Sequence, residues 1–366
     1  MMICDFSPAH IRAISPYVPG KPISELQREL GISDIDKLAS NENPRGPSPL
    51  ALQAAARALP EIGLYPDGNG YELKTALAQK YGVEREQIVL GNGSNDVLDM
   101  AARAFLSTQA SAVYSQHAFA VYPLAVQAMG ATGIETPARD YAHDLQAMLA
   151  AVRHDTRVVF VANPNNPTGT FVSAAPLRAF LGSLRPDVLL VLDEAYSEYL
   201  AAEEQTPSTA WLEEFPNLLI TRTFSKAYGL AGLRVGYGIA RSEVIELLNR
   251  VRAPFNVNSV ALCAAAAALG DSGFVRESFV LNRRGMAQIT AGLDCLGVSY
   301  SPSFGNFISV RVGDGASLYR HLLREGVIVR PIASYGMAEF LRVTIGLPKQ
   351  NDRFLAALER GLKAVT

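Results

Sequence analysis

The chain contains 366 residues, of which 49% are hydrophobic and 19% charged, so its composition excludes a disordered protein and provides apolar material for a sizeable core. This length favours two domains, because a single hydrophobic core stops growing before a chain becomes so long. The 33 basic and 35 acidic residues are spread along the chain and leave a formal net charge of -2, which argues against nucleic acid or a membrane surface as a partner.

Cysteine spacing and the length of apolar runs indicate where in the cell the protein is expected. Cys4, Cys263 and Cys295 lie far apart and lack CxxC spacing, which argues against a disulfide framework and against a zinc site. No apolar run reaches the roughly eighteen residues of a membrane span, and the N-terminal residues lack the pattern of a signal peptide. We therefore expect a cytoplasmic protein.

The pattern of apolar and polar residues divides the chain into three parts. Residues 1–40 are expected to form an N-terminal arm or part of a small domain. From about Ile88 to Ile239, short apolar runs alternate with longer amphipathic stretches, which predicts the strands and helices of a mostly parallel sheet. We expect an α/β fold, with a large domain over residues 41–255 and a smaller α+β C-terminal domain over residues 256–366.

The first segment that carries chemistry is GNGSNDVL, which puts Gly91, Gly93, Ser94 and Asn95 between a predicted strand and a predicted helix. Free backbone amides at a helix N-terminus attract anions, so this segment is a candidate phosphate site. It has neither the GK[ST] ending of a P-loop nor the GxGxxG spacing of a dinucleotide site. The alternative is a simple tight turn.

Two further segments place polar residues just after apolar, strand-like runs. VANPNNPTGT carries Asn163 and Asn166, and the Asn166 amide can donate to a phenolate oxygen, although an ordinary Asx turn is the alternative. VLLVLDEAYSEY carries Asp193, which suits a protonated pyridine nitrogen or a helix N-cap, and Tyr196, which suits a phenolic oxygen or the core. Ligands of parallel sheets bind beyond the carboxyl ends of the strands, so these residues are expected to share one crevice.

The segment TFSKAYGLAGLR places Lys226 beside Thr223 and Ser225, with Arg234 eight positions later. A lone lysine is usually a solvated surface charge. Two hydroxyl groups and an arginine nearby form a phosphate-binding set, however, and a phosphorylated aldehyde is the ligand that needs both a lysine and such a set.

Two late arginines lie in apolar surroundings, Arg330 in VIVRPI and Arg342 in FLRVTIG. A buried guanidinium without a partner is costly, so each is expected to meet a carboxylate or a phosphate. For Arg330 an internal salt bridge is an equal alternative, while Arg342 has the pattern of a substrate anchor.

Taken together, ten ordered segments resemble the histidinol-phosphate aminotransferase family of the class II, fold-type I pyridoxal-phosphate-dependent aminotransferases over nearly the whole chain. They are PYVPGKP, KLASNENPRGPSP, YPDG, GNGSNDVL, NPNNPTG, DEAY, SKAYGLAGLRVGY, NFISV, VIVRP and LRVTIG. NPNNPTG and SKAYGLAGLR mark the wider superfamily, whereas SNENP, VIVRP and LRVTIG point to this branch. The resemblance implies pyridoxal 5'-phosphate as cofactor and a homodimer with a shared active site.

The resemblance also implies a role for each matching residue. Lys226 is expected to bond covalently to the cofactor and to move the substrate proton, while Asp193 pairs with the pyridine nitrogen. Asn166 and Tyr196 are expected to hold the phenolic oxygen. The residues expected at the cofactor phosphate are Ser94, Asn95, Thr223, Ser225 and Arg234, with Tyr65 of the second subunit. Those expected at the anionic groups of the substrate are Arg330, Arg342, which is the usual holder of the glutamate carboxylate, and nearby Asn41.

One position departs from the family pattern. In SQHAFAVY, the place of the aromatic ring that stacks on the cofactor falls on His117, and Phe119 replaces it if the local register shifts. A histidine unrelated to the site is a further alternative. The other histidines show no metal-ligand spacing, and no metal is expected; they are His10, His143, His154 and His321.

The implied reaction is transamination between L-histidinol phosphate, a small-molecule amino donor, and the 2-oxo acid 2-oxoglutarate, in histidine biosynthesis. The nearest alternative is an aminotransferase for phenylalanine or tyrosine. A decarboxylase of a phosphorylated amino acid is a third reading, because it uses the same electron sink. The presence of Lys226, Asp193 and Asn166 argues against a catalytically inactive relative.

Overall fold

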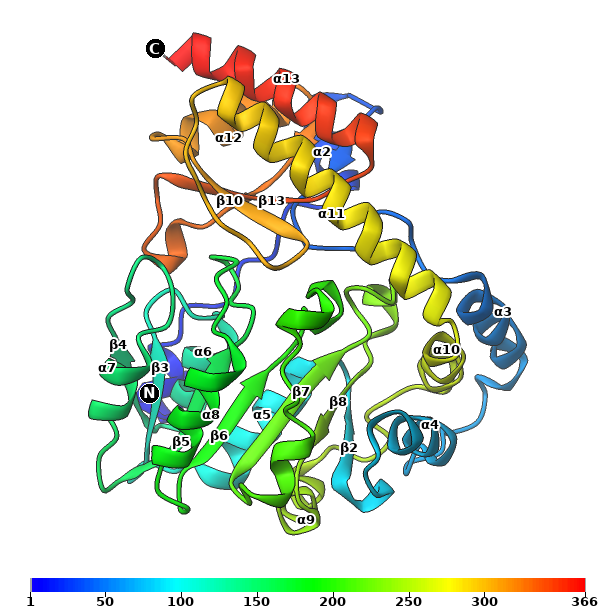
Figure 1. Cartoon of the computed structure of the whole chain (residues 1–366), viewed down its shortest axis with the longest axis vertical. Coiled ribbons are helices and arrows are strands. Elements are labelled where there is room, and N and C mark those ends of the chain that lie inside the picture. Colours follow the sequence, from blue (N-terminus) through cyan, green and yellow to red (C-terminus); the bar gives the residue numbers. More distant parts are fainter. Residues whose placement is uncertain (1, 366) are drawn as a thin grey trace.

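The computed structural model describes residues 2–365, and its central feature is a seven-stranded sheet in the order β2-β8-β7-β6-β5-β3-β4 (Figure 1). The strands are β2 (Ile88–Gly91), β3 (Ser111–Ser115), β4 (Thr132–Thr136), β5 (Thr156–Ala162), β6 (Leu189–Asp193), β7 (Leu218–Thr223) and β8 (Gly236–Ile239). Only β8 runs against its neighbours, β2 and β7. The carboxyl ends of β2, β5, β6 and β7 therefore meet at one edge of the sheet.

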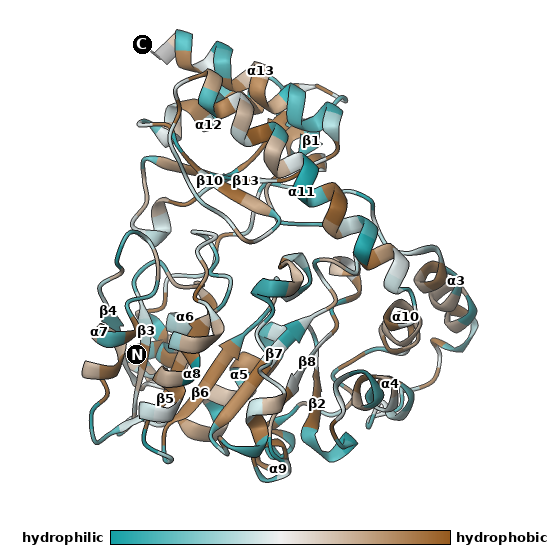
Figure 2. Cartoon of the chain, viewed as in Figure 1, coloured by the Kyte–Doolittle hydropathy of each residue, from teal (hydrophilic) through white to brown (hydrophobic). Residues whose placement is uncertain are grey.

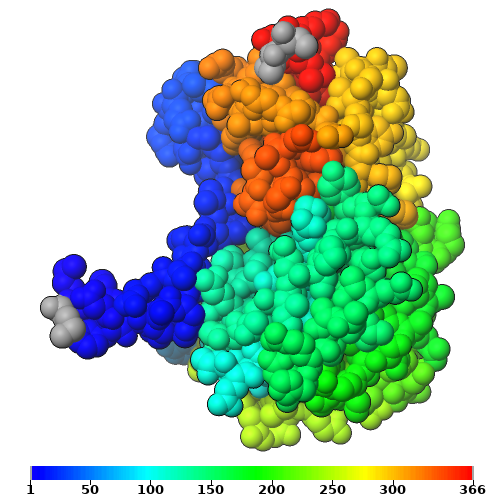
Figure 3. Space-filling view, turned by 90° about the vertical axis from the view of Figure 1, so that its left-hand side faces the viewer, coloured from blue at the N-terminus to red at the C-terminus, as the bar shows by residue number. Residues whose placement is uncertain are grey.

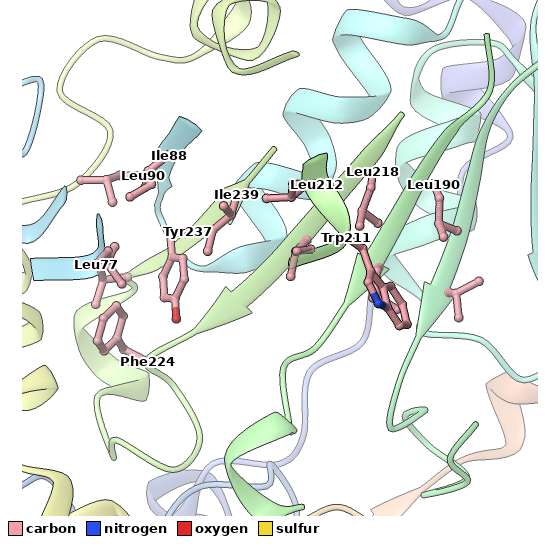
Figure 4. Packing of buried hydrophobic residues seen from close by; sticks show 14 of the residues in the cluster. Leu77, Ile88, Leu90, Leu190, Trp211, Leu212, Leu218, Phe224, Tyr237 and Ile239 are labelled. Carbon is pink, nitrogen blue, oxygen red and sulfur yellow. The ribbon is translucent and has the colours of Figure 1, made fainter. Parts of the chain in front are cut away.

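The central strands are continuous apolar runs because both faces of the sheet are covered. Along β5, Val159 and Val161 join the core on one face, while Val158 and Phe160 join the core on the other. Figure 2 shows the strands in the brown of apolar residues, and Figure 4 shows the first of these cores, with Leu190 and Trp211 among its members.

Helices on both faces of the sheet complete the large domain. The helices on the face drawn in Figure 4 are α3 (Pro49–Ala58), α4 (Tyr71–Tyr81), α7 (Leu145–Ala150), α8 (Ala174–Ser183) and α10 (Ser259–Leu269). Those on the opposite face are α5 (Ser94–Phe105), α6 (Val121–Ala128) and α9 (Ser242–Val251). The predicted α/β fold with a mostly parallel sheet is confirmed.

The smaller unit is a four-stranded antiparallel sheet in the order β12-β13-β10-β9 with helices packed on it (Figure 1). Its strands are β9 (Tyr300–Ser301), β10 (Phe307–Arg311), β12 (Arg330–Pro331) and β13 (Phe340–Thr344), and its helices are α11 (Ser272–Cys295), α12 (Gly315–Arg324) and α13 (Pro348–Val365). A core of its own includes Leu293, Ile308 and Leu322. Helix α11 runs between this unit and the large domain.

The N-terminal segment contacts both units. Figure 3 shows its first part as an arm that projects from the body, and the short helix α1 (Ala9–Arg12) packs on α6. Further on, Leu26 of α2 (Ile23–Leu30) packs against Ile328, and β1 (Asp36–Lys37) pairs in parallel with β11 (Val327–Ile328).

The expected domain division at residues 255 and 256 stays a prediction, and the packing of α10 bears on it. Although α10 follows that boundary in sequence, it packs on α3 and α4, and Ala261 and Ala265 belong to the core of the large sheet. This packing favours a later boundary, within α11.

Among residues 2–365, no single helix is long and apolar enough to cross a membrane. Helices α10 and α11 meet the criteria of length and composition only as a pair, and the pair is bent by 80°. The same stretch of chain holds no group of three or more His, Cys, Asp or Glu side chains that could bind a metal ion.

Candidate active site

One cavity opens at the carboxyl edge of the large sheet, beneath the small domain. Its lining includes every residue given a role at the cofactor or the substrate from the sequence, except His117 and Tyr65. Asn163, also expected in this crevice, is not in the lining, and its side-chain amide bonds instead to the backbone N and O of Val172. The residues that the cavity brings together are Asn41, Ser94, Asn95, Asn166, Asp193, Tyr196, Thr223, Ser225, Lys226, Arg234, Arg330 and Arg342. The topology explains this convergence, because β2, β6 and β7 all end here and α5 begins here.

Lys226 follows the end of β7 and points its amine into the cavity, where Nζ donates a hydrogen bond to the Ser40 carbonyl oxygen at 3.0 Å. Burial, followed by the nearby charge of Arg342, lowers the pKa of Lys226 to about 7. Near neutral pH a large fraction of this amine is therefore unprotonated, which is the form that acts as a nucleophile or a base.

At the start of α5 lies a set of groups suited to an anion. Gly93 precedes the helix without a side-chain cap, so the first backbone amides stay available. Arg234 Nη1 donates to Ser225 Oγ at 3.2 Å, and Ser225 N donates to Thr223 Oγ1 at 3.1 Å. A Cβ at Gly93 would fall against the guanidinium of Arg234, so any other residue there would displace this side chain.

Asp193 ends β6 and is 5% exposed. Its Oδ2 accepts a hydrogen bond from the Tyr122 hydroxyl at 2.9 Å, whereas its buried Oδ1 has no partner among the described residues. Burial raises the pKa of Asp193 to about 6. A carboxylate oxygen left without a partner at a cavity wall suits a ligand that donates a hydrogen bond.

The Tyr196 hydroxyl accepts two amide hydrogen bonds, from Asn41 Nδ2 at 2.9 Å and from Asn166 Nδ2 at 3.2 Å. Burial raises the pKa of Tyr196 to about 12, so it keeps its proton at neutral pH. Because both amides occupy acceptor positions, the hydroxyl hydrogen remains free to donate to a ligand oxygen.

Arg330 and Arg342 lie directly opposite each other on β12 and β13, and both line the cavity. Arg330 Nη2 donates to the Val18 carbonyl oxygen at 2.6 Å, and Arg342 Nη2 donates to the Ala39 carbonyl oxygen at 2.7 Å. Neither arginine forms an ion pair within residues 2–365, and the buried Nε of Arg342 has no partner there. The internal salt bridge considered for Arg330 is therefore wrong, and the two guanidinium groups suit anionic ligands.

The expectation that His117 stacks on a cofactor ring is not supported. His117 has a φ of 57°, its Nδ1 lies 2.5 Å from the Tyr335 carbonyl oxygen, and its ring packs near Tyr141, outside the cavity lining. The turn at His117 brings Phe119 to the cavity wall instead, as the alternative register predicts. A left-handed backbone turn shifts the side-chain register, which a motif match does not reveal.

Tyr65 lies away from this cavity, with 83% of its surface exposed and its ring stacked on Phe255 at 4.8 Å. Its expected role in a second subunit stays a prediction. Sequence reasoning missed Tyr17 and Ser40, which also line the cavity. Tyr17 lies in PYVPGKP, a segment that was matched without a role, and Ser40 acts through its backbone oxygen, which leaves no signal in residue type.

Comparison with known proteins places this site in a family. A family model for class I and II aminotransferases matches residues 33–358. The chain belongs to this family. Among its relatives, histidinol-phosphate aminotransferase 2 of Nitrosospira multiformis is 60% identical, with 99% of this chain and 93% of the relative covered. Histidinol-phosphate aminotransferase 1 of Thiobacillus denitrificans is 61% identical, with 98% and 94% covered.

The fold is shared with solved aminotransferases. The crystal structure of histidinol-phosphate aminotransferase from Sinorhizobium meliloti, in complex with pyridoxal-5'-phosphate, matches with a TM-score of 0.91 at 29% identity. The match covers 99% of this chain and 98% of that one. The predicted resemblance to the histidinol-phosphate aminotransferase family is thus confirmed.

The Sinorhizobium meliloti structure contains pyridoxal-5'-phosphate, and the cavity of this chain has groups that fit the same cofactor. The unpartnered Oδ1 of Asp193 suits a protonated ring nitrogen, and the amine of Lys226 suits the aldehyde. The hydroxyl hydrogen of Tyr196 suits the phenolic oxygen, and the set around Gly93 and Arg234 suits the phosphate.

Proposed function

We propose that this aminotransferase transfers the amino group of L-histidinol phosphate to 2-oxoglutarate in histidine biosynthesis. The observation that carries the proposal is the pair Arg330 and Arg342 on the cavity that holds Lys226, two buried guanidinium groups that have no carboxylate partner within residues 2–365. Each proposed substrate brings anionic groups, a phosphate in one and two carboxylates in the other. The names of relatives about 60% identical over nearly the whole chain support histidinol phosphate as the amino donor.

Pyridoxal phosphate, when bound, supplies the aldehyde that takes up the amino group and the ring that accepts the electron pair released at the substrate carbon. Lys226 is proposed to hold the aldehyde before the substrate arrives. Its Nζ then takes the proton from the carbon that bears the amino group and returns a proton in the reverse half of the cycle. A pKa of about 7 suits both tasks at neutral pH.

Other side chains are proposed to hold the cofactor and to orient its ring. Asp193 faces the ring nitrogen, and Tyr196 donates to the phenolic oxygen while Asn41 and Asn166 fix its hydroxyl. The groups proposed for the phosphate are Ser94, Asn95, Thr223, Ser225 and Arg234. Asn41 is proposed to act near the substrate mainly through this bond to Tyr196, because its amide is already engaged.

The anionic ends of the substrates are assigned to the two arginines. Arg342 contacts Asn166 through Nη1, so a carboxylate on Arg342 lies beside the groups that hold the ring oxygen. Arg330 lies toward Tyr17, whose ring is 5.4 Å from the guanidinium carbon, and is proposed to receive the phosphate of L-histidinol phosphate or the distal carboxylate of 2-oxoglutarate.

The proposal is tested by single-turnover absorbance of the cofactor-loaded protein after separate additions of L-histidinol phosphate, glutamate, phenylalanine and tyrosine. Rapid conversion by the first two and slow conversion by the aromatic amino acids supports it. Faster conversion by phenylalanine or tyrosine assigns the chain to aromatic substrates instead. Release of carbon dioxide without amino exchange would identify a decarboxylase.

We also propose a homodimer with a shared active site, working in the cytoplasm. Exposed apolar side chains gather before α4, with Ile62 66%, Leu64 72% and Tyr65 83% exposed. Large exposed apolar groups in adjacent positions favour a protein partner, and Tyr65 is proposed to reach the cofactor phosphate of the second subunit.

A further inference from the structure

Tyr122 lies beneath the cavity, outside its lining, on the helix α6. Its side chain is 0% exposed, its ring stacks on Phe160 of β5 at 4.8 Å, and the edge of Phe119 meets it at 5.8 Å. These contacts from a strand and a loop fix the ring plane. The hydroxyl group therefore has one direction available to it, and a buried hydroxyl needs a hydrogen-bond partner there.

That partner is the carboxylate of Asp193. The Tyr122 hydroxyl donates to Oδ2 at 2.9 Å, and Oδ1 is the oxygen that has no partner among the described residues. Burial, reinforced by the negative charge of Asp193, holds the pKa of Tyr122 well above its ordinary value. Tyr122 is thus a permanent donor to one oxygen of a carboxylate that lines the cavity, and the other oxygen has no partner among residues 2–365.

We propose that Tyr122 is a positioning residue for the cofactor, acting through Asp193 so that the proton shared with the cofactor ring stays on the ring nitrogen. A hydrogen bond donated to a carboxylate stabilises its charged form and lowers its affinity for a further proton. Without the phenol, Asp193 binds the shared proton more tightly and loses one of the groups that orient its carboxylate. This inference rests on the proposed role of Asp193.

The test replaces Tyr122 by phenylalanine, which keeps the stacked ring and removes the hydroxyl. Tyr237→Phe is the matched control, because Tyr237 is also fully buried and its hydroxyl has one tyrosine partner, Tyr81 at 2.7 Å, in the core on the other face of the sheet. Each apoprotein is loaded with pyridoxal phosphate labelled with ¹⁵N in the ring, and the ¹⁵N chemical shift and the dissociation constant of the cofactor are measured.

In Tyr122→Phe we expect the ¹⁵N signal to move toward that of an unprotonated pyridine and the cofactor to bind roughly tenfold more weakly, the size expected for losing a hydrogen bond to a charged group. Tyr237→Phe is expected to change the melting temperature alone. If Tyr122→Phe keeps both the wild-type signal and the wild-type affinity, the inference is wrong.

Asp193→Asn separates this inference from the function on which it depends. In that background Tyr122→Phe is expected to produce no further change in the ¹⁵N signal, because the carboxylate through which it acts is gone. If Asp193→Asn itself leaves the signal unchanged, the proposed role of Asp193 fails. If Asp193→Asn moves the signal and Tyr122→Phe moves it equally in both backgrounds, only the role of Tyr122 fails.

Discussion

At the scale of single residues, Lys226 illustrates how a fold changes the chemistry of a side chain. Its amine is removed from water and lies near the charge of Arg342, and both effects disfavour the protonated form. The pKa falls from its ordinary value of 10.5 to about 7, so the neutral form grows as pH rises through 7. Only the neutral amine can add to the aldehyde of the cofactor.

We therefore expect the rate at which the apoprotein takes up pyridoxal phosphate to rise with pH up to about 7 and to level off above it. Stopped-flow absorbance across a pH series measures this rate. Replacing Arg342 by methionine removes a cation that disfavours protonation and is expected to move the midpoint to higher pH. A wild-type midpoint near the ordinary lysine value would contradict the argument.

The proposed role of Arg342 as holder of the glutamate carboxylate can be tested with this substrate. Arg342→Ala is expected to weaken glutamate binding by about 2 to 5 kcal/mol, the usual cost of removing one partner of a buried charge pair. Steady-state kinetics gives this change as a rise in the Michaelis constant for glutamate. Arg320→Ala, on the exposed side of α12, serves as the control and is expected to have no effect. An unchanged constant in Arg342→Ala would reject the assignment.

How far the sequence predicts individual site residues depends on what encodes each position. In the sequence, Asp193 lies at the end of an apolar, strand-like run and Lys226 lies just after one, which predicts that both line the crevice, whereas their roles come from the resemblance. The sequence does not decide between His117 and Phe119, because the choice depends on one residue with positive φ. No sequence pattern predicts a site role for Tyr122, because a tyrosine on an apolar helix face is typical of a core residue.

At the scale of elements, the junction of β2 and α5 combines a turn, a helix start and a close approach. Gly93 has a φ of 81°, and a Cβ there would meet the guanidinium of Arg234. Gly82, at the end of α4, also has positive φ, at 65°, but has nothing within 4 Å of its Cβ position. Both glycines thus have positive φ, but only Gly93 has a side chain next to its Cβ position.

We expect Gly82→Ala to lose about 1 to 2 kcal/mol of stability, because alanine is disfavoured in the left-handed helical region. Gly93→Ala is expected to lose roughly 1 to 3 kcal/mol, because its φ of 81° and ψ of 165° lie in a region populated almost only by glycine. Only Gly93→Ala is also expected to weaken cofactor binding, since it displaces Arg234 from the proposed phosphate site. Thermal unfolding of the apoproteins measures the first effect, and titration with pyridoxal phosphate measures the second. Equal cofactor affinity in the two variants would show that Arg234 has no part in binding.

The sequence predicted the type of most elements but not their grouping. Alternating apolar runs indicated the strands of the large sheet, whereas their order and the reversed direction of β8 depend on long-range pairing that leaves no local pattern. The boundary placed near residue 256 follows a change of local composition. Packing of α10 against α3, about two hundred residues earlier in the chain, is a tertiary contact that no local pattern records.

At the scale of the whole molecule, one residue expected at the cofactor phosphate, Tyr65, lies outside the cavity of its own chain. Tyr65 stacks on Phe255, itself 47% exposed, on a surface that also carries Leu64. An interface built on such a surface repeats itself by two-fold symmetry, so each subunit is expected to supply Tyr65 to the other. Leu64→Glu is expected to give monomers in sedimentation equilibrium, while Leu347→Glu, on the small domain, leaves the dimer intact.

A mixture of two defective variants tests whether Tyr65 of one subunit completes the active site of the other. Lys226→Ala removes the covalent attachment and is expected to lose several orders of magnitude in rate, and Tyr65→Ala is expected to bind the cofactor weakly for want of one phosphate contact. In a mixed dimer, the subunit with intact Lys226 receives Tyr65 from its partner. Equal mixing after dissociation should therefore restore tight cofactor binding and turnover at roughly a quarter of the sites, as two-fold symmetry requires. Mixtures that behave as the average of the two variants would place Tyr65 in its own subunit's site or in none.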